Sequence, residues 1–409
     1  MKFLQWDRKV WQLMLNIEII YIIFINLLLA VTNFKPNLFA TIIIFIGLLV
    51  LNYYQDKNKY LPYFAIWLNL MLIPNNICIA WANTGNFLLD KLTIISPIIV
   101  IIMWAFWLVL LMPLAMTSAS RVNNWFLRLL AVLFLNVQFG QDIFFKIKHL
   151  PFLASFNDQG VITALAFLIL ICFLSYSWGF RFNPNLKFEP SLNFKWSVFT
   201  SLIVLLVINV LWNDFGGNGE TIFSMLFSFS ADIQAKYFTL NSFTAALRPA
   251  ILEEAERYIW MIIFLAGFNH YRKWRVPVAV YASTLLFSLS HFTNVGVDGQ
   301  SFMATVSQVI AVSDAMIWAV AFLYIGKLWI PMIAHFFMDY LINLQSGWSS
   351  VSSWNGSFPD WATTFIPVIF GLTVTIWMMF GERRKVMEEN ADRLLQIHNY
   401  NDFFVTNFI

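Results

Sequence analysis

The chain has 409 residues, of which 60% are hydrophobic and only 11% are charged, and its mean hydropathy is +0.70. A soluble globular domain carries about 25% charged residues, so this composition excludes an ordinary soluble protein. The net charge is only +3 and no basic block is interleaved with aromatic residues, so nucleic acid is not an expected partner.

Long apolar runs extend along most of the chain. A run of about 18 or more apolar residues can cross the hydrocarbon core of a bilayer as an α-helix. The sequence therefore predicts an all-α, polytopic transmembrane helical bundle of about twelve spans, with membrane lipid as its surroundings. The predicted spans are residues 12–32, 37–54, 62–82, 94–116, 127–145, 160–180, 196–213, 242–268, 276–292, 304–326, 328–345 and 363–381.

Two segments depart from this pattern. The end of the span 127–145 is crowded with polar residues, so it is the weakest prediction, and a re-entrant or interfacial helix is the alternative. The segment 214–241 alternates between polar and aromatic residues. We expect it to be an extramembrane loop with a short surface helix.

The basic residues predict an orientation. With both termini in the cytoplasm, 18 of the 25 Lys and Arg residues fall on the inner side and six on the outer side, while Arg257 lies within a span. An excess of Lys and Arg on one side is the positive-inside signal. We therefore expect a multi-pass protein of the cell membrane whose two termini are cytoplasmic. A bacterial source is a separate expectation.

Ionisable side chains within spans are costly and point to function, and three sets of them follow residue 245. In the first set, Glu253 and Glu254 precede Arg257 by four and three residues, so the arginine can pair with either carboxylate on one helix face. Either glutamate can serve as a general base. The alternative is a charged helix end at the membrane interface.

The other two sets each place two residues four positions apart, which puts both on one helix face. Phe287 and His291 form the second set, and His335 and Asp339 form the third. Taken alone, His291 could be an interfacial histidine, and the His335–Asp339 pair could be a polar contact between helices.

Together the three sets favour hydrolysis. A glutamate can take a proton from water, while two imidazoles can orient that water, stabilise an oxyanion or bind a metal. Zinc accepts two His ligands and one Glu ligand with an open position, and Glu254, His291 and His335 are the candidate ligands. The common zinc-protease motif H-E-x-x-H is absent from the sequence.

In order and spacing, these sets resemble the CAAX-protease and bacteriocin-processing family of intramembrane endopeptidases, also called CPBP or Abi proteins. The family pattern is E-E-x-x-x-R, then F-x-x-x-H, then H-x-x-x-N/D. The second and third motifs fit, but Arg257 comes one residue early. Aligned on this arginine without a gap, Leu252 and Glu253 occupy the paired-glutamate places, so either Glu253 or Glu254 could be the base.

The resemblance implies a helical membrane peptidase with its site between the motif helices, acting on a membrane-associated peptide or protein. Family members cleave prenylated proteins, process peptides or confer bacteriocin self-immunity. The family is named as metalloproteases, but a glutamate-activated water without a permanent metal is also argued, so Zn²⁺ is an open expectation. The implied catalytic residues are Glu253, Glu254, His291, His335 and Asp339, and the implied supporting residues are Arg257 and Phe287.

The expected organisation is a transmembrane region of unknown role at 1–240, the protease core at 241–346, a final span at 347–381 and a cytoplasmic tail at 382–409. Two other functions fit part of the pattern. The early Arg257 favours a non-catalytic immunity or scaffold protein. Buried ionisable groups also serve proton-coupled transporters, although the first half shows no matching pair of broken helices.

Overall fold

The computed structural model describes residues 8–33, 37–139, 145–147, 150–181, 190–217, 219–346 and 354–396. In these ranges the regular secondary structure is entirely helical. Within the described residues, eight helices are long and apolar enough to cross a membrane, or nine if one bent helix pair is counted as a single span. The prediction of an all-α, polytopic membrane protein is therefore confirmed.

The chain divides into two compact units, one within residues 1–179 and the other within 180–400. In the N-terminal unit, α3 contacts α1, α2, α4 and α6. Helices α7 and α8 meet at an angle of 52° and make up the bent pair. The helices of this unit are α1 (Arg8–Asn33), α2 (Asn37–Tyr54), α3 (Leu61–Lys91), α4 (Ser96–Trp107), α5 (Met112–Thr117), α6 (Trp125–Phe139), α7 (Pro151–Asp158) and α8 (Val161–Ser177).

Each of the twelve predicted spans coincides with helical structure. Three of them, however, are not among the nine helical segments of the described chain that are long and apolar enough to cross a membrane. The predicted span 127–145 corresponds to the shorter helix α6, and residues 140–144 lie outside the described part of the chain. The other two are 242–268 and 328–345, whose polar and charged residues make them less apolar than the rest. These two segments carry the first and third motifs.

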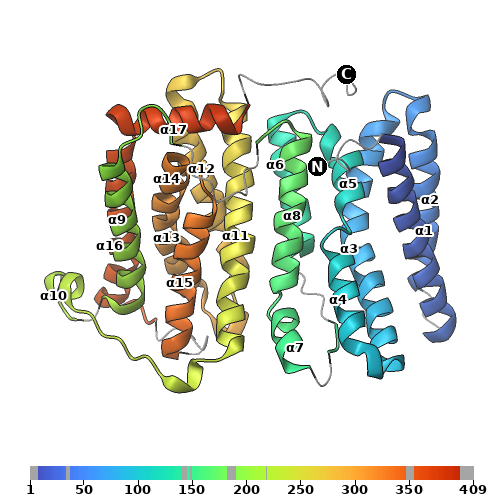
Figure 1. Ribbon diagram of the computed structural model, residues 1–409, viewed down its shortest axis with the longest axis horizontal. Coiled ribbons are helices and arrows are strands. Elements are labelled where there is room, and N and C mark those ends of the chain that lie inside the picture. Colours follow the sequence, from blue (N-terminus) through green and yellow to red (C-terminus); the bar gives the residue numbers. More distant parts are fainter. Residues whose placement is uncertain are drawn as a thin grey trace. The chain divides into compact units, whose positions relative to one another are not determined.

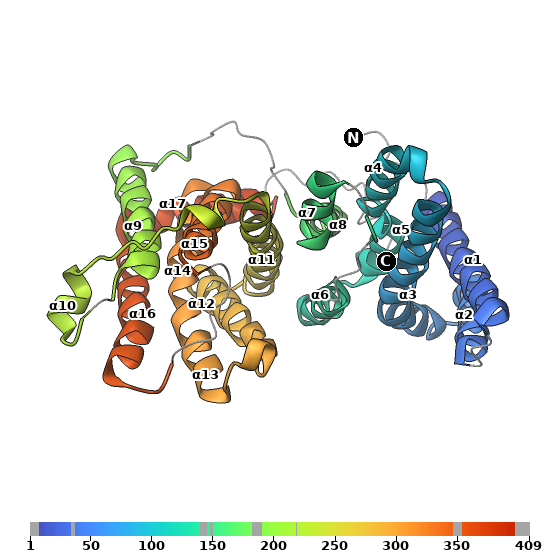
Figure 2. The same ribbon diagram turned by 90° about the horizontal axis from the view of Figure 1, so that it is seen from below.

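The C-terminal unit packs its helices around two central ones, α14 and α15. Seen along the helices, α11 and α12 lie on one side of this pair, and α9 and α16 lie on the other (Figure 2). The helices of this unit are α9 (Trp196–Phe215), α10 (Ile222–Phe227), α11 (Leu240–Gly267), α12 (Arg272–Ser290), α13 (Phe302–Ala311), α14 (Met316–Ile325), α15 (Trp329–Ser346), α16 (Phe358–Met378) and α17 (Gly381–Leu394).

Helix α14 is the core of this unit, because all ten of its residues are buried. It ends at Gly326, whose φ of +74° lies in the left-handed region that glycine adopts without strain. A turn of only three residues then leads into α15. This short connection makes α14 and α15 neighbours, so that Trp318 of α14 packs beside His335 of α15.

The segment predicted to be a tail begins with α17, which crosses one end of the C-terminal unit (Figure 1). It contacts α11, α12, α14 and α16. Asn390 donates to the last carbonyl groups of α14, and the buried Arg275 of α12 pairs with Glu388 and Asp392. The first part of the predicted tail is thus a packed helix of this unit.

Candidate active site

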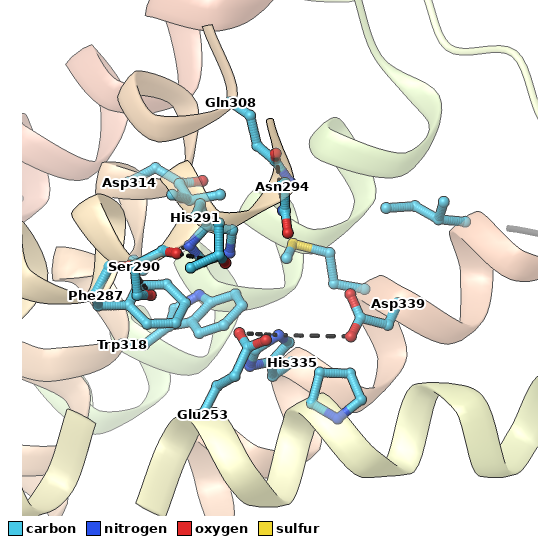
Figure 3. A pocket seen from close by; sticks show the side chains of 16 residues that line it. Glu253, Phe287, Ser290, His291, Asn294, Gln308, Asp314, Trp318, His335 and Asp339 are labelled. Carbon is cyan, nitrogen blue, oxygen red and sulfur yellow. Dashed lines mark hydrogen bonds and ion pairs between the residues drawn. The ribbon is translucent and has the colours of Figure 1, made fainter. Parts of the chain in front are cut away.

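A cavity of about 400 Å³ lies inside the C-terminal unit. Helices α11, α12, α14 and α15 contribute to its wall, together with the 3₁₀ turns that follow α12 and precede α14. Polar and ionisable side chains are gathered here among apolar ones (Figure 3). The ionisable residues of the wall are Glu253, His291, Asp314, His335 and Asp339.

The two adjacent glutamates of α11 occupy different environments. The side chain of Glu253 lines the cavity and is 28% exposed, whereas that of Glu254 is only 2% exposed. Oε2 of Glu254 accepts a hydrogen bond of 3.1 Å from Nη1 of Arg257. Its Oε1 lies 2.9 Å from Nδ1 of His335. Glu254 is therefore occupied by protein partners, while Glu253 faces the space where a substrate could bind.

His335 lies between the carboxylates of two helices. Its Nδ1 is held by Glu254, so its Nε2 is the nitrogen left for the cavity. Nε2 is 3.7 Å from Oε2 of Glu253 and 3.5 Å from Oδ2 of Asp339 (Figure 3). The first and third motifs thus meet at one imidazole, and the four-residue spacing of His335 and Asp339 places both on the cavity face of α15.

His291 marks the end of α12, where the helix tightens into a 3₁₀ turn. Its Nδ1 lies 3.0 Å from the carbonyl oxygen of Phe287. Because a carbonyl oxygen can only accept, Nδ1 carries the hydrogen, and Nε2 of the neutral ring has a free lone pair. The Phe287 and His291 rings also pack edge to face, 4.9 Å apart. The spacing of the second motif therefore orients the histidine through its own helix.

Arg257 links the first motif to the second and is only 1% exposed. Its guanidinium lies 3.9 Å over the ring of Phe287 and 5.2 Å over the ring of Trp318. Its Nε and Nη2 have no hydrogen-bond partner among the described residues. Two aromatic faces and the Glu254 carboxylate thus surround the buried charge, an arrangement in which cation–π contacts are strong.

Asp314 is a cavity residue that the sequence analysis missed. It is only 4% exposed, and its Oδ2 accepts hydrogen bonds from Nδ2 of Asn209 at 2.9 Å and of Asn213 at 3.0 Å. The signal was present, because Asp314 is a carboxylate inside the predicted span 304–326. Its asparagine partners on α9 lie about a hundred residues away in sequence and could not be inferred.

The metal ligands expected from the sequence are not assembled. No group of three His, Cys, Asp or Glu side chains in the described ranges is placed to hold a metal ion. Both oxygens of Glu254 are bound to Arg257 and His335, and Nδ1 of His335 is bound to Glu254. Glu254 is thus taken up by protein partners, whereas Nε2 of His335 and Nε2 of His291 are not, and in this arrangement Glu254, His291 and His335 do not converge on one point.

The fold and the cavity together define a class: a multi-pass helical membrane protein that gathers a glutamate and two histidines around a water-accessible space. Residues 235–341 match the family model described as type II CAAX prenyl endopeptidase Rce1-like. This segment is similar to that family, which agrees with the resemblance drawn from the three motifs. It extends from before α11 into α15 and contains every motif residue. No curated protein and no solved structure matches the chain significantly.

Proposed function

We propose that the protein is an intramembrane endopeptidase that hydrolyses a peptide bond with a water molecule activated by Glu253. One observation carries this proposal: Glu253, His291 and His335 line one cavity, and all three lie in the segment that matches the CAAX endopeptidase family model. A carboxylate and two imidazoles around a water-sized space are the groups that general acid–base hydrolysis needs.

Glu253 is a better base than Glu254 because of what each contacts. A general base must reach the attacking water, and Glu253 borders the cavity while Glu254 is buried behind it. Glu254 instead holds Arg257 on one side and Nδ1 of His335 on the other. Its proposed role is to position His335.

The proposed reaction is hydrolysis of a peptide bond, and water and the side chains of the cavity supply every proton that it needs. Glu253 takes a proton from water, and the water oxygen attacks the scissile carbonyl carbon. In its protonated form His335 donates from Nε2 to the developing oxyanion, while Nε2 of His291 accepts a hydrogen bond that orients the water. The protonated Glu253 then delivers its proton to the leaving nitrogen as the carbon–nitrogen bond breaks. Asp339 supports the orientation of His335 from the next turn of α15.

The proposed substrate is a membrane-associated peptide of the CAAX type that carries a prenyl group. The name of the matched family supports this class. Peptide processing related to bacteriocins is the other substrate class that the sequence resemblance implies. An unprenylated peptide tested in parallel separates the two.

The test uses the full-length protein in proteoliposomes with a farnesylated CAAX peptide, and mass spectrometry detects the released carboxyl-terminal fragment. We expect the parent protein to cleave the peptide and the E253Q variant to lose cleavage at equal protein level. The matched control is E382Q, which makes the same change in the exposed first turn of α17. Cleavage by E253Q at the parent rate would overturn the proposed role of Glu253. A parent protein that cleaves neither peptide would favour a non-catalytic relative.

A further inference from the structure

Helix α9 lies outside the family segment 235–341, yet one of its side chains reaches the cavity wall. Asn209 is only 2% exposed. Its Oδ1 accepts a hydrogen bond of 3.1 Å from Nε1 of Trp318, and its Nδ2 donates one of 2.9 Å to Oδ2 of Asp314. Both partners line the cavity.

The two bonds explain why the residue is an asparagine. An indole nitrogen can only donate, and a carboxylate can only accept. One side chain can satisfy both only if it carries an acceptor and a donor side by side, as an amide does. These two partners also determine the orientation of the amide: Oδ1 must face the indole of Trp318 and Nδ2 must face Asp314. Asn209 therefore connects the two partners, and a hydrophobic residue of equal size would leave the indole N–H of Trp318 without an acceptor and Asp314 with one amide donor fewer.

Trp318 links Asn209 to the proposed site, because its indole packs against both His335 and Arg257. Its ring centroid is 4.9 Å from that of His335, and the guanidinium of Arg257 lies 5.2 Å over its face. Trp318 is only 1% exposed and is held by close packing as well as by its single hydrogen bond to Asn209. A tilt of the indole plane would displace the imidazole and the guanidinium together.

We infer that Asn209 is a positioning residue of the proposed hydrolytic site, acting on His335 through Trp318. This inference rests on the proposed function and extends the site beyond the family segment. It assigns α9 a role in catalysis that none of the three motifs contains. Displacing a catalytic group by about 1 Å can cost about 100-fold in rate. Loss of the hydrogen bond between Asn209 and Trp318 should therefore lower kcat measurably if it lets His335 move.

Asn213 provides a matched control one turn further along α9. Its Nδ2 donates to the same oxygen of Asp314, at 3.0 Å, but the residue makes no hydrogen bond to Trp318 in the described structure. The variants N209L and N213L therefore remove the same kind of bond to Asp314. Only N209L also removes the acceptor of the indole.

The experiment measures kcat, KM and the melting temperature of both variants in proteoliposomes with the farnesylated peptide. We expect N209L to lower kcat by about 10–100-fold with KM within about twofold of the parent, and N213L to keep the parent kcat. The pH profile of kcat should change shape in N209L and not in N213L, because only the first variant moves His335. Equal effects of the two variants on kcat would overturn the inference.

The milder variant W318F gives a second test that does not depend on how N209L folds. It keeps a six-membered aromatic ring beside His335 and removes the five-membered ring of the indole together with its N–H. If Asn209 acts through this bond, W318F should reproduce the loss in kcat, and the N209L/W318F double variant should lose no more than either single one. Additive losses would contradict the inference. A parent protein that cleaves no peptide would instead refute the proposed function.

Discussion

Nδ1 of His335 lies 2.9 Å from Oε1 of Glu254, a contact that joins two buried residues 81 positions apart in the sequence. It connects the first motif to the third and leaves the preceding glutamate, Glu253, turned toward the cavity. Successive residues of an α-helix point about 100° apart, so the paired glutamates cannot share one environment. Their different surroundings predict different consequences of mutation.

The E253Q and E254Q variants should separate catalysis from stability. We expect E253Q to lower kcat by about 10²–10⁴-fold, the usual contribution of a general base, with the melting temperature of the parent. E254Q should lose stability in addition to the positioning of His335, because it leaves Arg257 as a buried charge without its carboxylate, which costs about 3–5 kcal/mol. Kinetics and thermal unfolding of both variants test this. Equal melting temperatures for the two would show that Glu254 does not stabilise the fold.

The F287L variant tests the contact between the first and second motifs. The Arg257 guanidinium lies 3.9 Å over the Phe287 ring, and a desolvated cation–π contact is worth about 2 kcal/mol. Leucine keeps most of the apolar volume but has no aromatic face. We expect F287L to lower the melting temperature more than F45L does. Phe45 of α2 is also buried but has no cation over its ring in the described structure. Equal losses would mean that only ring volume matters.

Gly371 of α16 permits a close approach to the turn that carries Asp314. A Cβ atom at this position would lie 2.8 Å from the backbone oxygen of Asp314, which is too close for a real contact. We expect G371A to destabilise the C-terminal unit by about 1–3 kcal/mol, the usual cost of overpacking. G47A in α2 is the control, because a Cβ there meets no atom within 4 Å. A melting temperature of G371A at or above that of the parent would contradict this.

The contacts of α17 predict a dependence of stability on pH. Burial acts to raise the pKa of the Asp392 carboxyl, but hydrogen bonds from Arg275 and Arg272 outweigh it, so the pKa is lowered from its usual value. A carboxyl whose pKa is lower in the folded state contributes stability above its unfolded pKa of about 3.9. That contribution is lost as the pH falls through the folded pKa.

We therefore expect the melting temperature to fall below about pH 4, and D392N to be less stable at neutral pH with a shallower fall in acid. Thermal unfolding across a pH series measures both effects. K385A is the matched control, since its ion pair with Glu382 on the same helix is exposed and should contribute nothing measurable. The same acid dependence in D392N and the parent would exclude Asp392 as the titrating group.

Removal of metal should leave the proposed activity intact. Both oxygens of Glu254, one of the three predicted zinc ligands, are taken up by Arg257 and Nδ1 of His335, and no group of three ligands in the described ranges is placed to hold an ion. We expect the parent to keep its rate of peptide cleavage after dialysis against a chelator. Loss of cleavage that zinc alone restores would refute this prediction and support the metal expectation drawn from the sequence.

The positions of the helices could be predicted from the sequence because hydropathy is a local, additive property. Each predicted span coincides with helical structure, including the two polar spans that hold the first and third motifs. Spacings within a helix were equally informative. Phe287 and His291 contact each other, as do His335 and Asp339, because residues four apart share a face.

Tertiary structure alone decided how these helices combine. The rotation of α11 about its axis determines that Glu253 rather than Glu254 faces the cavity, and no periodicity in the sequence specifies that angle. The contacts of Asp314 with Asn209 and of Arg275 with Asp392 join residues more than 100 positions apart. Such pairs depend on which helices become neighbours, and that is determined by the packing of the whole unit rather than by any local segment of the chain.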